Sequence, residues 1–209
     1  MELVIIRHAE SIHNTGATED LDSSLSNDGF RQMKLTTRWL KNTFFKDKEI
    51  KSFIGYASPL LRCLQTARTI SHNLQIPFKV DCDLREFSVT KENTTSPSLK
   101  IKKRKESYDF QWLDNFHELE EIYFSEENLA DFIPRVKQFY SKLNKENGKY
   151  IVVSHGSVCR CLHALATNNL EALVDRYSNF DFEENTSIKN CGITVINKGK
   201  EIMFSKKVY

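Results

Sequence analysis

Three short apolar runs, each followed at once by polar or charged residues, leave few fold classes open to this chain. They are ELVII (residues 2–6), SFIGYA (52–57) and KYIVVS (149–154), and each has the composition of a buried β-strand. Helical patterns follow each run. Strands that alternate with helices predict an α/β fold of three layers, in which a mostly parallel central sheet is flanked by helices. Ligands of such sheets bind just beyond the carboxyl ends of the strands, so the residues after each run are the first site candidates.

Helical spacing of apolar residues marks the connecting segments. Ser26 is the expected N-cap of the first helix, and Pro59 is expected in the first turn of the second helix, where its missing N–H costs nothing. A further short strand is expected at PFKV (77–80), and a hairpin around residues 197–200 closes the chain. The expected helices cover residues 25–45, 58–72, 116–124, 127–143 and 156–167.

We expect the whole chain, residues 1–209, to form one domain, since this length suits a single core and no repeat or linker is visible. The least regular stretch contains KENTTSPSLKIKKRKES. We expect a surface insertion there, around residues 87–125. The basic run from Lys100 to Lys105 is open to three interpretations: a solvated face, a nuclear-localisation-like tetrapeptide, or a segment that recruits a second anionic group of a substrate.

Composition excludes several function classes. The formal net charge is only +2, so we expect no nucleic-acid partner. No apolar run approaches membrane-spanning length and no signal-like segment precedes the first strand, so we expect no membrane association and a cytoplasmic location. The five cysteines are odd in number and fit a reducing compartment. The Cys159–Cys161 pair lacks zinc-site spacing. The oligomeric state is left open, a homodimer included.

Three of the expected strands end in residues that can bind an anion. The first ends at Arg7 and His8, the second at Ser58 with Arg62 one turn further, and the third at His155 and Gly156. If these strands are neighbours, two arginines and two histidines converge on one edge of the sheet. A phosphoryl group is the natural ligand of such a set, because arginine offers a fork of donors that matches two phosphate oxygens. A helix that starts at Gly156 would point its unpaired N–H groups to the same place.

The order of five motifs resembles a known family. They are RHAES followed by Asn14, LSNDGFRQ, SPLLRCLQTA, the LRE of residues 84–86, and VVSHGSVCR. Together they resemble the histidine phosphatase superfamily, in its phosphoglycerate mutase-like branch (branch 1). The resemblance runs from residue 3 to about residue 165, and NCGITVI is similar to the family's last strand. It implies the phosphoglycerate mutase-like version of the three-layer fold.

The resemblance also implies a reaction and the roles of its residues. His8 would be the nucleophile that takes a phosphoryl group from a small phosphorylated substrate. Glu86 would protonate the leaving oxygen and then deprotonate the attacking water. Two other carboxylates are candidates, Asp83 close to Glu86 in the sequence and Glu10 close to His8, and Glu10 could orient an arginine instead.

Four further residues would hold the phosphoryl group. The resemblance assigns its oxygens to Arg7, Arg62 and His155, with an additional hydrogen bond from Asn14. No metal and no cofactor would be needed, because the arginines supply the positive charge. Read without the resemblance, Arg62 could lie along a helix face and His155 could be an ordinary core histidine.

Two departures from the family pattern affect the choice of function. Ala9 stands where the family usually has glycine, which would cause strain only if that position requires a positive φ. The Gly/Trp-rich stretch typical of the mutases is replaced after Glu86 by EFSVTKENTTSPS. The leading hypothesis is therefore a metal-independent phosphatase that forms phospho-His8. The alternatives are a cofactor-dependent phosphoglycerate mutase and a phospho-ligand binding module without turnover.

Overall fold

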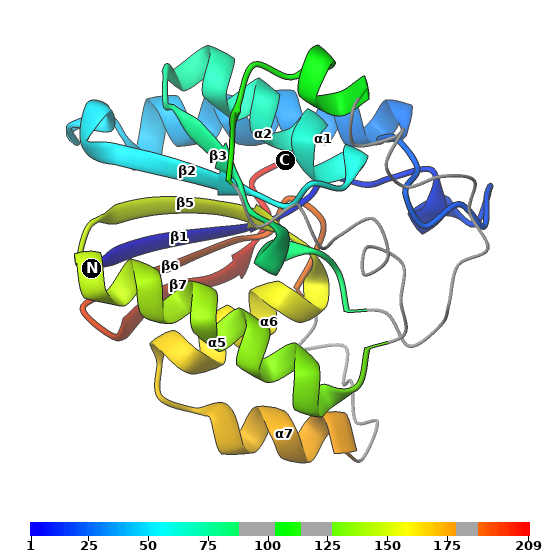
Figure 1. The fold of residues 1–209 in the computed structure, drawn as a ribbon. Coiled ribbons are helices and arrows are strands. Elements are labelled where there is room, and N and C mark those ends of the chain that lie inside the picture. The colour runs from blue at the N-terminus through cyan, green and yellow to red at the C-terminus, as the bar shows by residue number, and fades with distance from the viewer. Residues whose placement is uncertain (88–102, 114–126, 179–187) are drawn as a thin grey trace.

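Seven strands form one sheet in the computed structural model, which describes residues 1–87, 103–113, 127–178 and 188–209 (Figure 1). The spatial order of the strands is β4-β3-β2-β5-β1-β6-β7. The first five of these run parallel, whereas β6 and β7 are antiparallel to their neighbours. The strands are β1 (Glu2–Arg7), β2 (Phe53–Ala57), β3 (Phe78–Val80), β4 (Gln111–Trp112), β5 (Lys149–Ser154), β6 (Ile193–Asn197) and β7 (Lys200–Lys206).

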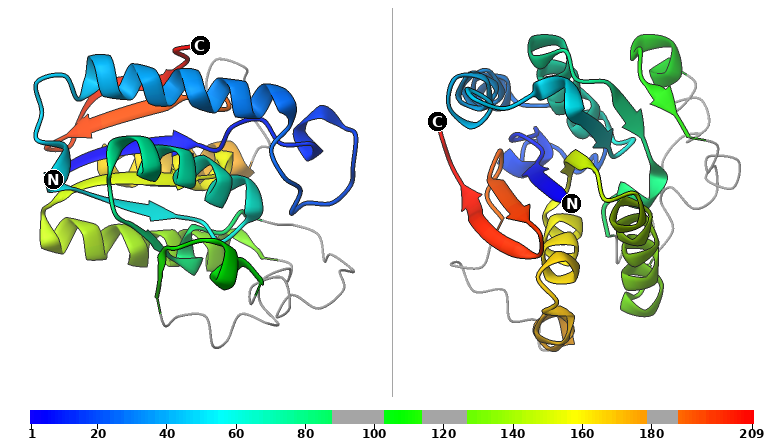
Figure 2. Two further views of the ribbon diagram at one scale, coloured as in Figure 1. Left: turned by 90° about the horizontal axis from the view of Figure 1, so that it is seen from above. Right: turned by 90° about the vertical axis from the view of Figure 1, so that its left-hand side faces the viewer.

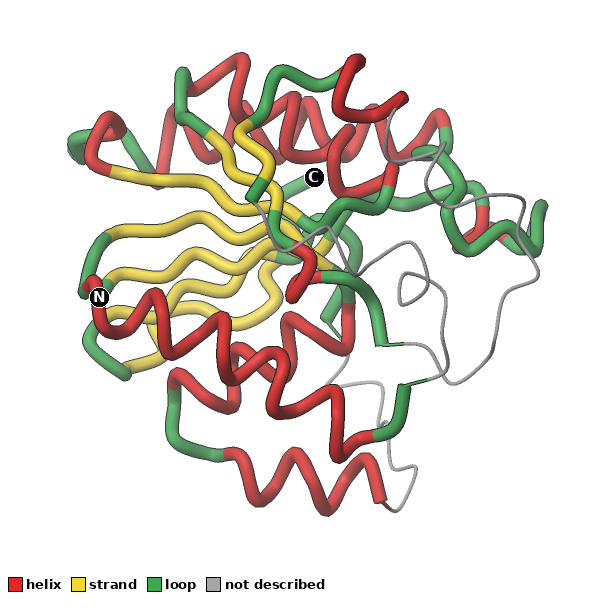
Figure 3. The backbone as a smooth tube through the Cα atoms, viewed as in Figure 1, coloured by secondary structure: helices red, strands yellow, loops and turns green. Residues whose placement is uncertain are grey.

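Helices cover both faces of the sheet, so the predicted three-layer, mostly parallel α/β fold is confirmed. Figures 1 and 3 show α1 (Asn27–Trp39) and α2 (Leu61–Leu74) on one face, with α5 (Leu129–Glu146), α6 (Gly156–Ala166) and α7 (Leu170–Ser178) on the other. The end-on view in Figure 2 separates the two helical layers clearly. No helix within the described ranges is long and apolar enough to cross a bilayer.

The two layers follow from the alternation of side chains along each strand. Val4 and Ile6 of β1 belong to the core that packs against α1 and α2, whereas Leu3 and Ile5 belong to the core beneath α5 and α6. Successive residues of a strand point to opposite faces, so an uninterrupted apolar run serves two cores at once. This explains why residues 3–6 (LVII) are all apolar instead of alternating with polar residues.

The helix starts were predicted with mixed success. Ser26 is the N-cap of α1, as predicted, and its Oγ accepts the amide hydrogen of Gly29 at 2.9 Å. The expectation that Pro59 lies in the first turn of the second helix is wrong. Helix α2 begins at Leu61, because Leu60 is still extended, and the Leu61 amide is bound by the carboxylate of Asp22 at 2.9 Å. That distant carboxylate substitutes for a local cap.

The remaining elements agree in part with the predictions from the sequence. The closing hairpin of β6 and β7 is confirmed, as is the short strand β3. Neither β4 nor α7 was predicted, since both are short and weakly patterned. The expected helix over residues 116–124 lies outside the described residues, as does most of the expected insertion around 87–125. The extent of the single domain stays a prediction.

Candidate active site

The carboxyl ends of β1, β5 and β2 lie side by side, as their order in the sheet requires. Arg7 is in register with Ser154, and the amide of His8 donates to the Ser154 carbonyl at 2.8 Å. On the other side of β5, the amide of Ser58 donates to the carbonyl of Val153 at 3.0 Å. The chain segments that follow the three strands are therefore held together by backbone hydrogen bonds.

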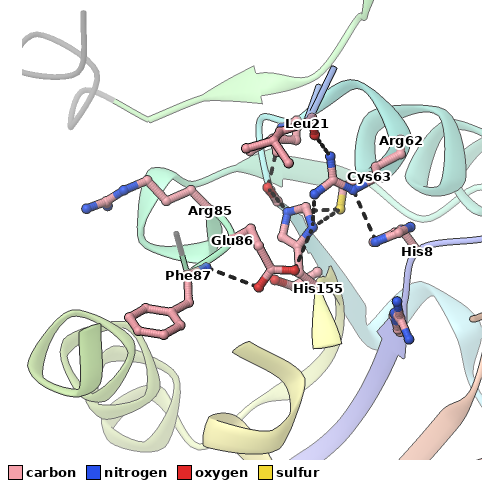
Figure 4. Close-up of polar contacts among 12 residues, drawn as sticks. His8, Leu21, Arg62, Cys63, Arg85, Glu86, Phe87 and His155 are labelled. Atoms are coloured by element: carbon pink, nitrogen blue, oxygen red, sulfur yellow. Dashed lines mark hydrogen bonds and ion pairs between the residues drawn. The ribbon is translucent and has the colours of Figure 1, made fainter. Parts of the chain in front are cut away.

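His8, Arg62 and His155 meet at this edge (Figure 4), and Arg7 is close enough that its charge lowers the pKa of both histidines. These four residues are here called the Arg–His cluster. The ring centroids of the two histidines are 5.2 Å apart. Nε of Arg62 lies 3.1 Å from Nε2 of His8, and its Nη2 lies 3.0 Å from Nδ1 of His155. One guanidinium thus contacts both imidazoles, which excludes the simple readings of Arg62 as a side chain along a helix face and His155 as an isolated core histidine.

Hydrogen-bond directions fix the protonation of His8. Arginine can only donate, so Nε2 of His8 must accept from Arg62 and carries no proton. Nδ1 lies 2.7 Å from the carbonyl of Ala9, which can only accept, so the ring proton is on Nδ1. Burial, followed by the charges of Arg62 and Arg7, lowers the pKa of His8 well below 6.5. His8 therefore presents an unprotonated Nε2 toward the cluster.

Arg62 and Arg7 are both anchored by backbone carbonyls. Nη1 of Arg62 donates to the carbonyl of Leu21, and Nη1 of Arg7 donates to the carbonyl of Ile188 at 2.7 Å. Nε of Arg7 is buried and has no hydrogen-bond partner among the described residues. A Cβ built on Gly156, the first residue of α6, would lie 3.7 Å from this nitrogen. The site thus holds a buried cationic donor that an anion could satisfy.

Glu86 lies near Nδ1 of His155, the same nitrogen that Arg62 contacts. Its Oε2 is 3.6 Å from Nδ1 of His155, and its Oε1 accepts the amide hydrogen of Phe87 at 3.1 Å. Desolvation raises the pKa of Glu86 above 4.5, and the positive charge of Arg62 only partly offsets this. About 30% of the side chain is still exposed, so the carboxyl can exchange protons with solvent. Such a group can act as an acid at a higher pH than an ordinary glutamate.

The loop that carries Glu86 is held by α5. Arg135 donates from Nη1 to the carbonyls of Asp83 and Arg85, at 2.6 and 3.1 Å. Its Nε and Nη2 bind the carboxylate of Glu127, which also accepts from Arg85 at 3.3 Å. The sequence predicted an apolar face for this helix, and no local pattern marks Arg135 as a buried residue within it.

Asn14 is oriented by three hydrogen bonds. Its Oδ1 accepts from the amide and the hydroxyl of Ser11 and from Nδ2 of Asn190, each at 3.1 Å. Asn190 Nδ2 is also 3.1 Å from the carbonyl of His8, and its own carbonyl accepts from the hydroxyl of Tyr209 at 2.8 Å. Because the Oδ1 atom of Asn14 is fully used, its Nδ2 is the group that can donate to a ligand. Asn190 was not identified from the sequence.

The other two candidate carboxylates, Glu10 and Asp83, have different surroundings. Oε1 of Glu10 accepts from the hydroxyl of Ser26 at 2.7 Å, so Glu10 supports the N-cap of α1. Among the described residues, Glu10 does not bind an arginine, so the expectation that it orients one is not met. Asp83 is half-buried beside Asp81, and burial raises its pKa to about 6. In the described structure neither carboxylate contacts a histidine of the cluster.

Ala9 is compatible with the backbone of the site. It is not among the residues with positive φ, so the methyl group causes no strain there. Its amide donates to Oγ1 of Thr66 at 3.2 Å, and that hydroxyl in turn donates to the carbonyl of Arg62 at 2.7 Å. Thr66 therefore couples the segment after His8 to the helix that carries Arg62.

The basic run contains a buried member. Lys103 and Lys105 are exposed, whereas Arg104 is only 7% exposed, so the solvated reading is wrong for Arg104. Arg104 forms an ion pair with Asp22, the residue that caps α2, and Nη1 donates to the carbonyl of Pro59 at 3.1 Å. This contact fixes the loop that supports Arg62. Lys100 and Lys102 lie outside the described residues, and recruitment of a second anionic group by the run stays a prediction.

We expect Arg104→Ala to destabilise the protein, because it leaves the fully buried carboxylate of Asp22 without its cation. Removing one partner of a buried ion pair costs about 3 kcal/mol or more in the free energy of unfolding. Lys103→Ala is the matched control, since its exposed side chain should change the value by less than about 0.5 kcal/mol. Urea denaturation of both variants measures the difference, and equal effects would contradict the buried contact.

Comparisons with known proteins show what this chain is similar to. The model of the histidine phosphatase superfamily (branch 1) matches residues 3–201. A protein of Hydrogenobacter thermophilus with the name "Putative phosphoserine phosphatase 2" is 30% identical over 201 residues, which cover 93% of this chain and 88% of that protein.

Solved structures share the fold. A mycobacterial glucosyl-3-phosphoglycerate phosphatase in complex with VO3 superposes with a TM-score of 0.60 at 19% identity, covering 94% of this chain and 90% of the other. A phosphoserine phosphatase from Entamoeba histolytica in complex with 3-phosphoglyceric acid gives a TM-score of 0.58 at 20% identity, with coverages of 97% and 94%. At these identities the likeness shows the fold alone.

Proposed function

Because the chain belongs to the histidine phosphatase superfamily (branch 1), we propose that it is a metal-independent phosphatase that hydrolyses a phosphomonoester through a phosphohistidine on His8. The observation that carries the proposal is the arrangement of Arg62. One guanidinium lies within hydrogen-bond distance of the unprotonated Nε2 of His8 and of Nδ1 of His155. A phosphoryl group bound to this guanidinium has the nucleophile beside it, already neutral.

In the first step, Nε2 of His8 attacks phosphorus and the bond from phosphorus to the ester oxygen breaks. Negative charge spreads over the three remaining oxygens in the transition state. Arg62 and the buried Nε of Arg7 donate to these oxygens, and Nδ2 of Asn14 adds a neutral donor. Glu86 delivers its proton to the leaving oxygen, so an alcohol departs rather than an alkoxide.

In the second step, water attacks the phosphorus of phospho-His8. The carboxylate of Glu86, now deprotonated, takes a proton from this water, and the bond from nitrogen to phosphorus breaks. Inorganic phosphate leaves, and His8 recovers its lone pair on Nε2. Glu86 is protonated again, so the cycle closes. The positive charge that a metal would provide is supplied in both steps by the two arginines.

We propose a small phosphorylated metabolite that also carries a carboxylate as the substrate. The relatives support this class by name: one is called a phosphoserine phosphatase, and another phosphoserine phosphatase was solved with 3-phosphoglyceric acid. Phosphoserine is therefore the first compound to test. A panel of phosphorylated sugars and nucleotides would show whether the carboxylate matters.

Phosphate release and phosphoenzyme trapping together test the proposed reaction. We expect the purified protein to release phosphate from phosphoserine and from p-nitrophenyl phosphate, with equal rates in the presence and absence of EDTA. Rapid quenching in alkali should retain a phosphoprotein that acid destroys, as a phosphohistidine requires. Isomerisation of 3-phosphoglycerate with a 2,3-bisphosphoglycerate primer would indicate a mutase instead, and no turnover of any phosphomonoester would indicate a binding module.

Glu86→Gln should slow alkyl esters far more than aryl esters. For phosphoserine we expect kcat/KM to fall about 10²-fold or more, because the alkoxide needs a proton as it leaves. For p-nitrophenyl phosphate, whose leaving group needs little protonation, the loss should be below about tenfold. The acid form of Glu86 exists below its raised pKa, so activity on phosphoserine should fall as the pH rises through that value, and the variant should lose this pH dependence.

Asp83→Asn is the matched control for Glu86→Gln. It removes a carboxylate from the same loop that does not contact the Arg–His cluster, and it should leave the ratio of alkyl to aryl activity unchanged. Equal losses on both esters in Glu86→Gln would contradict the acid role.

A further inference from the structure

We propose that Ser58 is a positioning residue that holds the ring proton of His155 on Nε2, so that Nδ1 takes up a proton when a dianionic phosphoryl group binds. The proposal deepens the proposed function and rests on it only in placing the anion beside His155. Neither the strand-end pattern nor the comparisons assign this role to Ser58.

Ser58 is held rigidly at the end of β2. The residue is completely buried, and its amide donates to the carbonyl of Val153 in β5. Its hydroxyl oxygen accepts the amide hydrogen of Leu60 at 3.3 Å and lies 2.8 Å from Nε2 of His155. Its side chain also forms a hydrogen bond with Cys63, which partly offsets the raised pKa of that thiol. The sulfur of Cys63 can therefore accept the hydroxyl hydrogen of Ser58. The oxygen of Ser58 is then able to accept a hydrogen bond from Nε2 of His155.

The opposite side of the ring sets the direction of this hydrogen bond. Nη2 of Arg62, 3.0 Å from Nδ1, can only donate, so Nδ1 must be an acceptor in the free protein. The single proton of a neutral imidazole is then on Nε2 and is donated to Ser58. Without the serine hydroxyl, the hydrogen-bond partner of Nε2 that remains among the described residues is Sγ of Cys63 at 3.4 Å, a much weaker acceptor. The free-energy difference that favours the Nε2–H tautomer of His155 over the Nδ1–H tautomer would then become smaller.

The charges around His155 explain why anion binding changes its protonation. In the free protein the pKa of His155 lies well below 6.5, because of burial and then the charge of Arg62. The titratable and charged groups that face the ring come from every element around it: Arg62 and Cys63 on α2, Arg7 at the end of β1 and His8 directly after it, Glu86 after β3, and Arg135 on α5.

A dianion that binds Arg62 and Arg7 draws the Nη2 donor away from Nδ1 and offsets the positive charge. The unoccupied nitrogen then accepts a proton from solvent and donates it to an anion oxygen. The proton on Nε2 stays with Ser58 throughout, so the ring does not rotate or exchange its partner. Ser58 thus decides which nitrogen of His155 faces the phosphoryl group as the protonatable one.

Nitrogen-15 NMR of the histidine rings tests the proposal on the unmodified protein. In the free parent protein at pH 7 we expect His155 as the Nε2–H tautomer and His8 as the Nδ1–H tautomer. Tungstate, a dianion that does not titrate near neutral pH, should convert His155 to the doubly protonated form. Observation of the Nδ1–H tautomer for His155 in the free protein would overturn the proposal without any variant.

Variants of Ser58 supply the second test. In Ser58→Ala we expect a mixture of both tautomers of His155 and about tenfold weaker binding of tungstate. Ser58→Thr keeps the hydroxyl and should restore the single tautomer and the affinity. Thr194→Val is the matched control, since it removes another completely buried hydroxyl, one that accepts from the amide of Ser205 and has no contact with His155 among the described residues. An unchanged His155 spectrum in Ser58→Ala would refute the positioning role.

Proton uptake separates His155 from Glu86 as the group that titrates. Calorimetry of tungstate binding in two buffers of different ionisation enthalpy should show uptake of about one proton per site at pH 7. Glu86→Gln should keep this uptake if His155 takes the proton, and abolition of the uptake in that variant would contradict the proposal. These measurements need no turnover, so their result is independent of whether the protein hydrolyses phosphomonoesters.

Discussion

His8→Ala is expected to lower kcat on p-nitrophenyl phosphate by more than about 10³-fold, the largest effect of any single change considered. The proposed reaction assigns the covalent intermediate to His8 alone, because Nε2 of His155 is bound to Ser58 and its Nδ1, on the proposal above, takes up a proton when the anion binds, so neither nitrogen of His155 keeps a lone pair for attack. Loss of a nucleophile typically removes nearly all covalent catalysis and leaves only transition-state binding.

The control for this variant is His72→Ala, which removes an exposed histidine near the end of α2. It should leave kcat unchanged. The trapped alkali-stable phosphoprotein should disappear in His8→Ala and persist in His72→Ala. Retention of the phosphoprotein in His8→Ala would move the nucleophile to another residue and refute the mechanism.

The strand ends could be predicted from the sequence because a single rule governs them. Parallel strands present their carboxyl ends at one edge, so Arg7, His8 and His155 had to meet once β1 and β5 were neighbours. Arg62 followed because it lies in the first turn of the helix after β2, the next strand in the sheet. The strands themselves were visible because each is buried on both faces and therefore continuously apolar.

The supports of the site could not be predicted, since each depends on a contact between residues distant in sequence. Asp22 caps α2 although it lies nearly 40 residues before Leu61 in the sequence. Arg104, which forms the ion pair with Asp22, lies about 80 residues after Asp22. Arg135 binds the carbonyls around Glu86 from the middle of an amphipathic helix. Asn190 orients Asn14 across 176 residues. No local pattern marks such residues, because a buried arginine looks like a surface one until its partner is known.

The error at Pro59 has the same origin. A proline followed by a helical pattern usually occupies the first turn, where no amide is needed. Here the helix starts two residues later, because the carboxylate of Asp22 binds the amide of Leu61 and Arg104 binds the carbonyl of Pro59. Tertiary contacts of the loop therefore determine where α2 begins, and with it where Arg62 points.

Arg62→Ala is expected to lower kcat/KM by about 10³-fold, and Arg62→Lys should recover little of this loss. The guanidinium presents separate donors to His8 and His155 and a third to the carbonyl of Leu21, which a single ammonium group cannot reproduce. Removal of one donor to a developing oxyanion commonly costs 10²- to 10³-fold, and here several are removed together.

A second readout distinguishes lost transition-state binding from simple disruption of the fold. The charge of Arg62 is one of the causes that lower the pKa of both histidines, after burial. Without that charge the pKa of His8 should rise toward 6.5. Its neutral form should then be lost at a higher pH, and the acidic limb of the residual activity should move upward.

Arg68→Ala is the matched control, because Arg68 is an exposed arginine on the same helix that lies against the ring of Tyr108. It should change neither kcat/KM nor the position of the acidic limb. If Arg62→Ala retained more than a tenth of the parent activity, or if its acidic limb stayed in place, then Arg62 would not be the common partner of the two histidines, and the proposed binding of the phosphoryl group would have to be abandoned.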